Sequence, residues 1–188
     1  MNRQNQRNPQ KHCKPFKEAF MNDPKQTAHT EFLAKINELL KDIRIAMLTT
    51  QHQGGELFSR PMTTQEAEFD GTLYFLTSKK TGKIADLVQF PKVNLAYSHP
   101  GKNSYVSVSG RAQLLDDRQK IDELWNPINA AFFPDGKDDP DIVVLKIEAE
   151  SAEYWDSPSS KIVQAYSFIK TAITGDHDHA GENERQKI

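Results

Sequence analysis

Residues 105–114 alternate between apolar and polar side chains, and this pattern restricts the fold more than any other stretch of the chain. The apolar positions are spaced by two or four residues: Val106, Val108, Ala112 and Leu114. Because successive side chains of a β-strand point to opposite sides, these four residues share one face. A strand that is apolar on one face and polar on the other is typical of an antiparallel sheet with one side on the core.

Six other segments are predicted to be strands, each four to six residues long: 45–50, 58–63, 72–77, 93–98, 142–147 and 152–155. Turn residues separate most of them, including Gly54 and Gly55 within 51–56 and the pair formed by Asp70 and Gly71. Seven short strands joined by such turns predict a closed or nearly closed antiparallel barrel.

Four helices are predicted around these strands: roughly 27–43, 82–90, 117 to about 131, and about 159–174. The first carries an apolar stripe at helical spacing: Phe32, Leu33, Ile36, Leu39, Leu40 and Ile43. Pro91 follows the second helix and Gly175 follows the fourth, as expected for residues that end helices.

The two ends of the chain differ in composition from its middle. Six apolar side chains lie in the first 26 residues and two in the last 14, whereas the middle is about 41% apolar, as in globular domains. We therefore predict one folded domain over 27–174, flanked by a disordered basic tail over 1–26 and a disordered polar tail over 175–188.

The charges and the apolar runs exclude several classes of protein. The chain has 24 basic and 26 acidic residues, and the predicted domain is mildly acidic, so we expect no nucleic-acid partner. No apolar run approaches ~18 residues and none follows the charged N-terminus, so we expect no membrane span, no secretory signal and a cytoplasmic location. The single cysteine, Cys13, permits neither a disulfide framework nor a cysteine-based metal site within one chain.

Residues 73–84 run from a strand through a short loop into a helix, and the loop is rich in groups that bind phosphate. It holds three hydroxyl side chains and three lysines: Thr77, Ser78, Thr81, Lys79, Lys80 and Lys83. Gly82 lets the backbone approach a ligand, and free N–H groups at the start of a helix favour an anion. The loop is therefore a candidate phosphate site, although it lacks the Walker spacing. The alternative is a solvated turn in which Thr81 caps the helix.

The segment 58–63 is a second candidate, because it places Arg60 and Pro61 side by side in a predicted strand. Proline removes a ladder donor and belongs at a sheet edge or a bulge, so the backbone there is partly free to meet a ligand. The guanidinium of Arg60 can donate two parallel hydrogen bonds to a phosphate. The alternative is an edge strand whose proline discourages aggregation and whose arginine is merely solvated.

Four segments, taken in order, resemble the pyridoxamine 5'-phosphate oxidase-like flavin-binding split barrels, and among these the branch called general stress protein 26. They are Ser-Arg-Pro-Met at 59–62, Phe-Leu-Thr-Ser with Lys83 at 75–83, Tyr-Val-Ser-Val-Ser-Gly at 105–110 and Ala-Glu-Tyr-Trp-Asp at 152–156. The resemblance covers about 28–174. It implies a mainly β (α+β) fold, a six-stranded antiparallel split β-barrel with peripheral helices, which forms a homodimer and binds FMN at the subunit interface.

The resemblance also implies which residues hold the flavin. They are Arg60, Thr81 and Lys83 at the phosphate, Thr77 and Ser78 nearby, Pro61 and Met62 along the isoalloxazine ring, and Tyr105 and Trp155, from the partner subunit, beside the ribityl chain or the ring. The chemistry agrees, because a dianionic phosphate attracts cations and hydroxyls and a flat ring attracts apolar contacts. Ordinary core packing is the alternative for Tyr105 and Trp155.

The chain departs from the biosynthetic oxidase at three points. That enzyme has an arginine at the position of Gly82, a lysine for the substrate's phosphate at the position of Gln65, and an Arg-x-His-x-Arg segment that is absent after Trp155. We therefore expect an FMN protein, with FAD as the alternative cofactor, that is an oxidoreductase of an unknown small molecule and not the biosynthetic oxidase. The alternatives are a non-enzymatic flavin-binding or stress-response module and a haem- or deazaflavin-binding barrel. No side chain stands out as a catalytic acid or base.

Histidines at two places in the chain suggest other chemistry. His99, before Pro100, could be an axial haem ligand, although a residue of a simple turn is the alternative. His177 and His179 lie in an Asp-His-Asp-His segment that could bind a metal, but such a segment in a polar tail is typical of solvated sequence. We predict no metal site.

Overall fold

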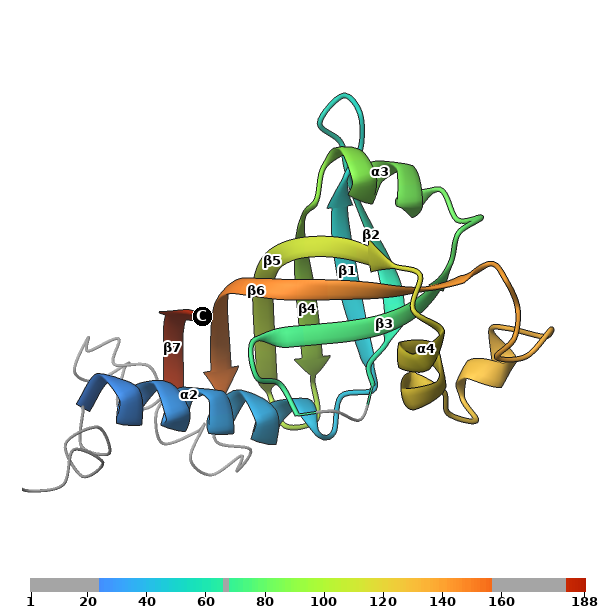
Figure 1. Cartoon of the computed structure of the whole chain (residues 1–188). Coiled ribbons are helices and arrows are strands. Elements are labelled where there is room, and N and C mark those ends of the chain that lie inside the picture. Colours follow the sequence, from blue (N-terminus) through green and yellow to red (C-terminus); the bar gives the residue numbers. More distant parts are fainter. Residues whose placement is uncertain (1–23, 66–67, 157–181) are drawn as a thin grey trace, which may run out of the picture.

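The computed structural model describes residues 24–65, 68–156 and 182–188, in which a curved antiparallel sheet is flanked by helices (Figure 1). The elements in chain order are α2 (Pro24–Leu40), β1 (Ile45–Gln51), β2 (Leu57–Thr63), β3 (Thr72–Ser78), α3 (Lys83–Gln89), β4 (Lys92–His99), β5 (Ser104–Leu115), α4 (Arg118–Leu124), the 3-10 turn η1 (Asn129–Ala131), β6 (Ile142–Asp156) and β7 (Glu182–Lys187). Within these residues no helix has the length and apolar character needed to cross a membrane.

The sheet is a split barrel that does not close. Its strands follow the order β2-β1-β4-β5-β6-β3, and β7 pairs with β6 beside that path. Every neighbouring pair is antiparallel. In the described part of the chain, β2 and β3 end the path and do not pair with each other. The opening leaves one edge of each strand available to a ligand, because its backbone groups have no ladder partner there.

Strand β6 is continuous over 15 residues, where the sequence predicted two short strands at 142–147 and 152–155. Its first half pairs with β3 and its second half with β7, while β5 runs beside both halves. The register with β5 shifts between Ser109 and Gly110, so that β6 holds one extra residue. A β-bulge of this kind interrupts the alternation of a strand, which explains why the prediction was wrong.

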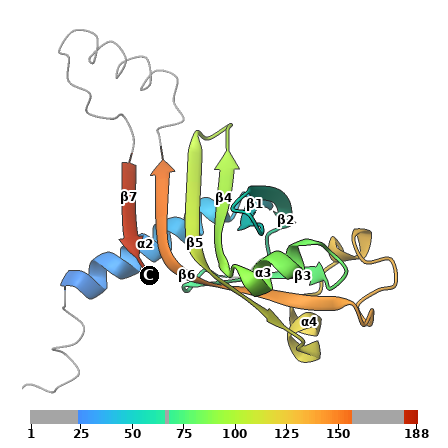
Figure 2. The ribbon, with the colours of Figure 1, turned by 90° about the horizontal axis from the view of Figure 1, so that it is seen from above.

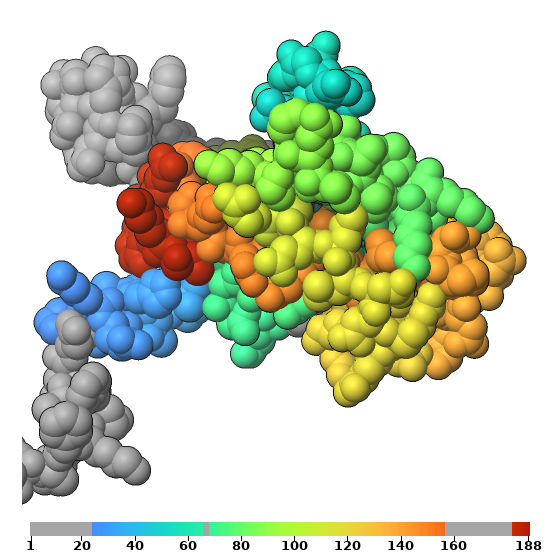
Figure 3. Space-filling model, turned by 45° about the horizontal axis from the view of Figure 1, so that its top comes forward, coloured from blue at the N-terminus to red at the C-terminus, as the bar shows by residue number. Residues whose placement is uncertain are grey.

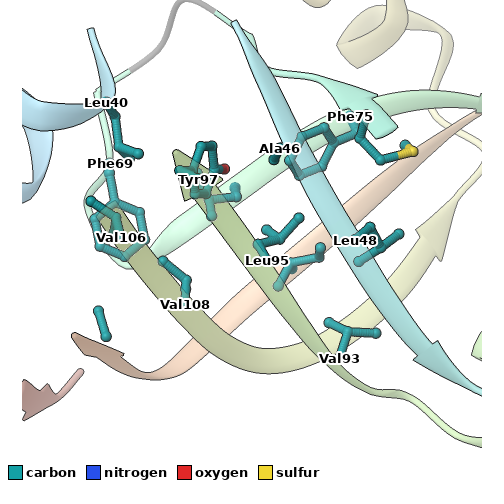
Figure 4. Packing of buried hydrophobic residues seen from close by; sticks show 14 of the residues in the cluster. Leu40, Ala46, Leu48, Phe69, Phe75, Val93, Leu95, Tyr97, Val106 and Val108 are labelled. Carbon is teal, nitrogen blue, oxygen red and sulfur yellow. The ribbon is translucent and has the colours of Figure 1, made fainter. Parts of the chain in front are cut away.

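Alternate residues of the sheet form the main core. Leu48 of β1, Leu95 of β4 and Val108 of β5 point inward and are fully buried (Figure 4). Helix α2 covers one end of this core with Phe32 and Ile36, which are also buried. The predicted apolar stripe of this helix is thus confirmed, although each end of the helix lies three residues before the predicted one.

Helix α4 ends at Leu124, well before the predicted end at about 131. Asp117 caps its start, because the Asp117 carboxylate accepts a hydrogen bond of 3.0 Å from the backbone N–H of Lys120. The helix does not extend further because Asn126 precedes Pro127, and a residue before proline disfavours helical backbone. The chain continues instead through a loop that contains η1.

The segment 182–187 forms strand β7, where the sequence predicted part of a disordered tail. It lies beside the second half of β6 (Figure 2), and Gln186 Oε1 is 3.3 Å from His29 Nδ1 of α2. This strand has no apolar pattern, because none of its side chains is buried. It is held by backbone hydrogen bonds to β6. The helix predicted at about 159–174 and the N-terminal residues 1–23 lie outside the described residues.

Candidate functional site

A cavity of about 460 Å³ lies at the opening between β2 and β3. Its walls come from the start of β1, the end of β2, the end of β3 with the turn after it, the first residue of α3, and the loop after α4. The lining residues are Ile45, Pro61, Met62, Thr63, Gln65, Leu76, Thr77, Ser78, Thr81, Lys83, Asn129, Phe132 and Phe133. The size falls within the range of small-molecule and cofactor sites.

The structure brings most of the predicted site residues to this one cavity. Six of the nine line it: Pro61, Met62, Thr77, Ser78, Thr81 and Lys83. Arg60 precedes Pro61 in β2, and its charge acts on Lys83. The two candidate segments, 58–63 and 73–84, thus meet across the opening, because they contain β2 and β3, the two strands that end the order of the sheet.

Tyr105 and Trp155 lie elsewhere. They face each other as register partners on β5 and β6, point away from the core, and are each 39% exposed. Neither lines the cavity. Core packing, the alternative for both side chains, is wrong, and their predicted role at the flavin of a partner subunit stays a prediction.

Lys83 and Arg60 form a pair of neighbouring cations. Burial lowers the pKa of Lys83, and the nearby charge of Arg60 lowers this pKa further. No carboxylate of the described residues lies within ion-pair distance of Lys83. Arg60 donates a hydrogen bond of 3.0 Å from Nη1 to Thr50 Oγ1, and its Nη2 lies 3.9 Å from Asp86 Oδ2. Within the described residues these two cations have one carboxylate at ion-pair distance, and such an excess of positive charge favours the binding of an anion.

The other two lysines of the loop are bound to carboxylates. Lys79 donates a hydrogen bond of 2.7 Å to Asp116, and Lys80 forms an ion pair with Asp141. Neither lysine lines the cavity. Of the three lysines that the sequence offered, Lys83 is therefore the one placed to meet a ligand there.

The turn before α3 differs from the predicted cap. Thr81 does not cap the helix: its hydroxyl donates a hydrogen bond of 2.9 Å to the backbone oxygen of Ser78. Gly82 occupies the N-cap position, and no side chain caps the helix there. Thr81 is thus not used as a cap, and it is one of the residues that line the cavity.

Gln65 is a site residue that the sequence marked only as a departure from the oxidase pattern. The Oδ1 atom of Asn126 accepts hydrogen bonds from the backbone N–H groups of Ile128 and Asn129, at 2.9 and 3.3 Å. The Asn126 amide nitrogen must then be its donor, and it donates to Gln65 Oε1 at 3.1 Å. Gln65 Nε2 consequently points elsewhere, and it is buried with no hydrogen-bond partner among the residues that the structure describes. A cavity residue with a free, oriented donor suits a ligand that carries carbonyl oxygens.

Apolar side chains form much of the remaining wall. Ile45, Phe132 and Phe133 line the cavity, and Phe132 is 63% exposed. No group of three or more potential metal ligands occurs among the described residues. Cations on one side, an oriented amide donor and flat apolar walls together suit a ligand with an anionic group and a planar body.

The histidine alternatives receive no support from the described residues. His99 is the last residue of β4, and its Nδ1 accepts a hydrogen bond of 3.2 Å from the backbone N–H of Lys102 in the turn that follows. The Asp-His-Asp-His segment lies outside the described residues.

Comparison with known proteins gives one family. A family model described as pyridoxamine 5'-phosphate oxidase like matches residues 31–179. General stress protein 26 of Bacillus subtilis is 36% identical over 120 residues, which cover 62% of this chain and 82% of that protein.

Solved structures agree with this match. A structure described as a general stress protein 26 from Jannaschia sp. CCS1 superposes with a TM-score of 0.67 at 25% identity, over 85% of this chain and 99% of that one. The general stress FMN/FAD binding protein of Xanthomonas citri is 35% identical with a TM-score of 0.61, over 70% of this chain and 92% of that one.

Proposed function

The chain belongs to the pyridoxamine 5'-phosphate oxidase-like family, and on that premise we propose that it binds FMN in the cavity between β2 and β3. The observation that carries the proposal is the pair formed by Arg60 and Lys83 beside a cavity with apolar walls, since within the described residues one carboxylate, that of Asp86, lies within ion-pair distance of these two cations. The name of the Xanthomonas citri relative, an FMN/FAD binding protein, supports a flavin as the ligand.

The cavity walls suit the parts of the cofactor. Arg60, Lys83 and the hydroxyl of Thr81 would hold the phosphate, because a dianion gains most from charged and hydroxyl donors. Pro61 and Met62 would contact the ring, and the free amide of Gln65 suits a carbonyl oxygen. FAD, with its second phosphate, is the alternative cofactor.

We propose that the protein is a flavin-dependent oxidoreductase of a small molecule. A bound flavin supplies the redox chemistry, while these residues bind and orient it. The neutral Gln65 and Gly82 carry no charge for a second phosphate, so the substrate differs from that of the biosynthetic oxidase. A module that holds flavin without turnover is the alternative.

Protein mixed with FMN and then separated from unbound flavin by gel filtration should retain the absorbance of oxidised flavin at about 450 nm, and titration should show quenched flavin fluorescence. Reduction of that flavin by a nicotinamide cofactor, followed by reoxidation with a candidate acceptor, separates the oxidoreductase from the binding module. Absence of binding at flavin concentrations well above the micromolar range would contradict the proposal, because typical cofactor sites are saturated there.

We further propose a homodimer with the flavin site at its interface. The outward face of the sheet carries exposed apolar side chains on three strands: Met47 of β1, Tyr105 of β5 and Trp155 of β6. Met47 and Tyr105 are linked through register partners on β4, so they share one side of the sheet. An apolar face of this kind on a small protein is typical of an interaction surface.

Replacing Met47 with glutamate should shift the protein toward monomer in sedimentation, because a charge would be buried in the interface. The variant should also bind FMN more weakly if the partner completes the site. Ile128→Glu is the matched control, since Ile128 is 41% exposed, close to the 40% of Met47, but lies in the loop after α4. A wild-type protein that remains monomeric when saturated with FMN would contradict the shared site.

A further inference from the structure

A histidine, a buried aspartate and Arg60 form a line behind the proposed phosphate site. His52 lies in the turn between β1 and β2, which Figure 3 shows in cyan beside α3 in light green. Its Nδ1 is 2.6 Å from Oδ1 of Asp86, whose side chain is 7% exposed. The other carboxylate oxygen of Asp86 faces Arg60 Nη2 at 3.9 Å. That distance is too long for a hydrogen bond.

Asp86 is therefore hydrogen-bonded to His52 but not to Arg60. A buried carboxylate needs a hydrogen-bond partner, and within the described residues His52 is the side chain hydrogen-bonded to Asp86, while Arg60 is the other basic side chain within 4 Å. An ionised carboxylate only accepts hydrogen bonds, so His52 Nδ1 is the donor in this pair. Arg60 Nη2 lies 3.9 Å from Asp86 Oδ2, so a hydrogen bond between the two would need them to approach by less than about 1 Å.

Arg60 is thus shared between two possible anions. Its Nη1 is held by the buried hydroxyl of Thr50, which leaves its other donors for either Asp86 or a ligand phosphate. A guanidinium paired tightly with Asp86 would lose donors and net charge toward a phosphate. Among the described residues, the basic side chains within 4 Å of the Asp86 carboxylate are His52 and Arg60, and Lys83 lies three residues before Asp86 on α3.

We propose that His52 is a positioning residue that occupies Asp86 and so leaves Arg60 free to bind the phosphomonoester group of the ligand; this inference rests on the proposed function. Without the donor at His52, Asp86 takes Arg60 as its partner and competes with the phosphate. The hydrogen bond from His52 to Asp86 therefore favours the binding of a phosphorylated flavin. Riboflavin has no phosphate for Arg60 to contact, so its binding does not depend on this hydrogen bond.

His52→Phe removes the donor but keeps a ring in contact with Phe58, which lies 5.6 Å from the imidazole centre. We expect FMN to bind about tenfold more weakly to this variant, and riboflavin to change by less than about twofold. His52→Asn keeps a donor near the position of Nδ1 and should restore FMN affinity. Titration by flavin fluorescence, with melting temperatures to verify folding, gives all of these values. Equal losses of FMN and riboflavin would overturn the inference.

Asp86→Asn provides the decisive second test, because it removes the competing charge. The single variant should bind FMN at least as tightly as the wild type, and His52→Phe with Asp86→Asn should recover most of the lost affinity. If Asp86→Asn selectively weakens FMN, Asp86 is an anchor that Arg60 needs, and the inference is wrong. Two results on the wild-type protein would together overturn the proposed phosphate site itself: FMN binds no more tightly than riboflavin, and inorganic phosphate does not displace bound FMN.

Discussion

Lys83→Ala should weaken FMN binding by roughly 10- to 100-fold and leave riboflavin binding nearly unchanged. The expected range corresponds to about 1.5–3 kcal/mol, the usual contribution of a hydrogen bond to a charged group. Lys83 is partly buried beside Arg60 and has no carboxylate partner in the described residues, so its charge is available to a phosphate and little else depends on it. The difference between the two flavins isolates the phosphate, because riboflavin lacks only that group.

Lys80→Ala is the matched control for this experiment. Lys80 belongs to the same loop, but it pairs with Asp141 and is outside the cavity wall. Its removal should leave both flavins unaffected. Equal losses of FMN and riboflavin in Lys83→Ala, or an equal effect of Lys80→Ala, would show that the phosphate lies elsewhere. Arg60→Ala should resemble Lys83→Ala in affinity, and it should also lower stability, because Asp86 loses a neighbouring cation.

Gly110→Ala should lower the free energy of unfolding by about 2–4 kcal/mol, a large effect for one methyl group. Gly110 lies at the β-bulge between β5 and β6. A Cβ atom there would lie 2.2 Å from the backbone oxygen of Glu148 and 3.0 Å from the Cα of Ala149. Both contacts are with backbone, so the two central strands would have to separate. Urea denaturation followed by circular dichroism measures the change.

Gly82→Ala is the control for the stability measurement. Gly82 has a φ of −58°, and a Cβ atom there would meet nothing within 4 Å. Alanine at this position should be neutral or stabilise by about 0.4–1 kcal/mol, because it restricts the unfolded chain. A Gly110→Ala protein as stable as the wild type would mean that the bulge can relax, and that the close approach of β5 and β6 is not required.

Local patterns in the sequence were sufficient to identify most strands and the candidate site. The alternation in 105–114 predicted β5, because an extended backbone turns a period of two into one buried face. The Arg60-Pro61 pair and the loop 77–83 marked the two segments that line the cavity, because their residue types suit an edge strand and a phosphate. These properties depend on neighbours in the chain, which the sequence displays directly.

Pairing between segments distant in the sequence decided the extent of β6, the presence of β7 and the contacts within the candidate site. The bulge joins two predicted strands into β6, and β7 adds to it with no apolar pattern at all. The same is true of the site: three lysines in one loop are equivalent in the sequence, but Asp116 and Asp141 occupy two of them and leave Lys83 to the cavity. The orientation of the Gln65 amide likewise depends on Asn126, which is far away in the sequence. The contacts of His52 and Arg60 with Asp86 join the β1–β2 turn and β2 to α3. Hydrogen bonds and ion pairs act over a few ångströms in space, so only the tertiary structure could assign them.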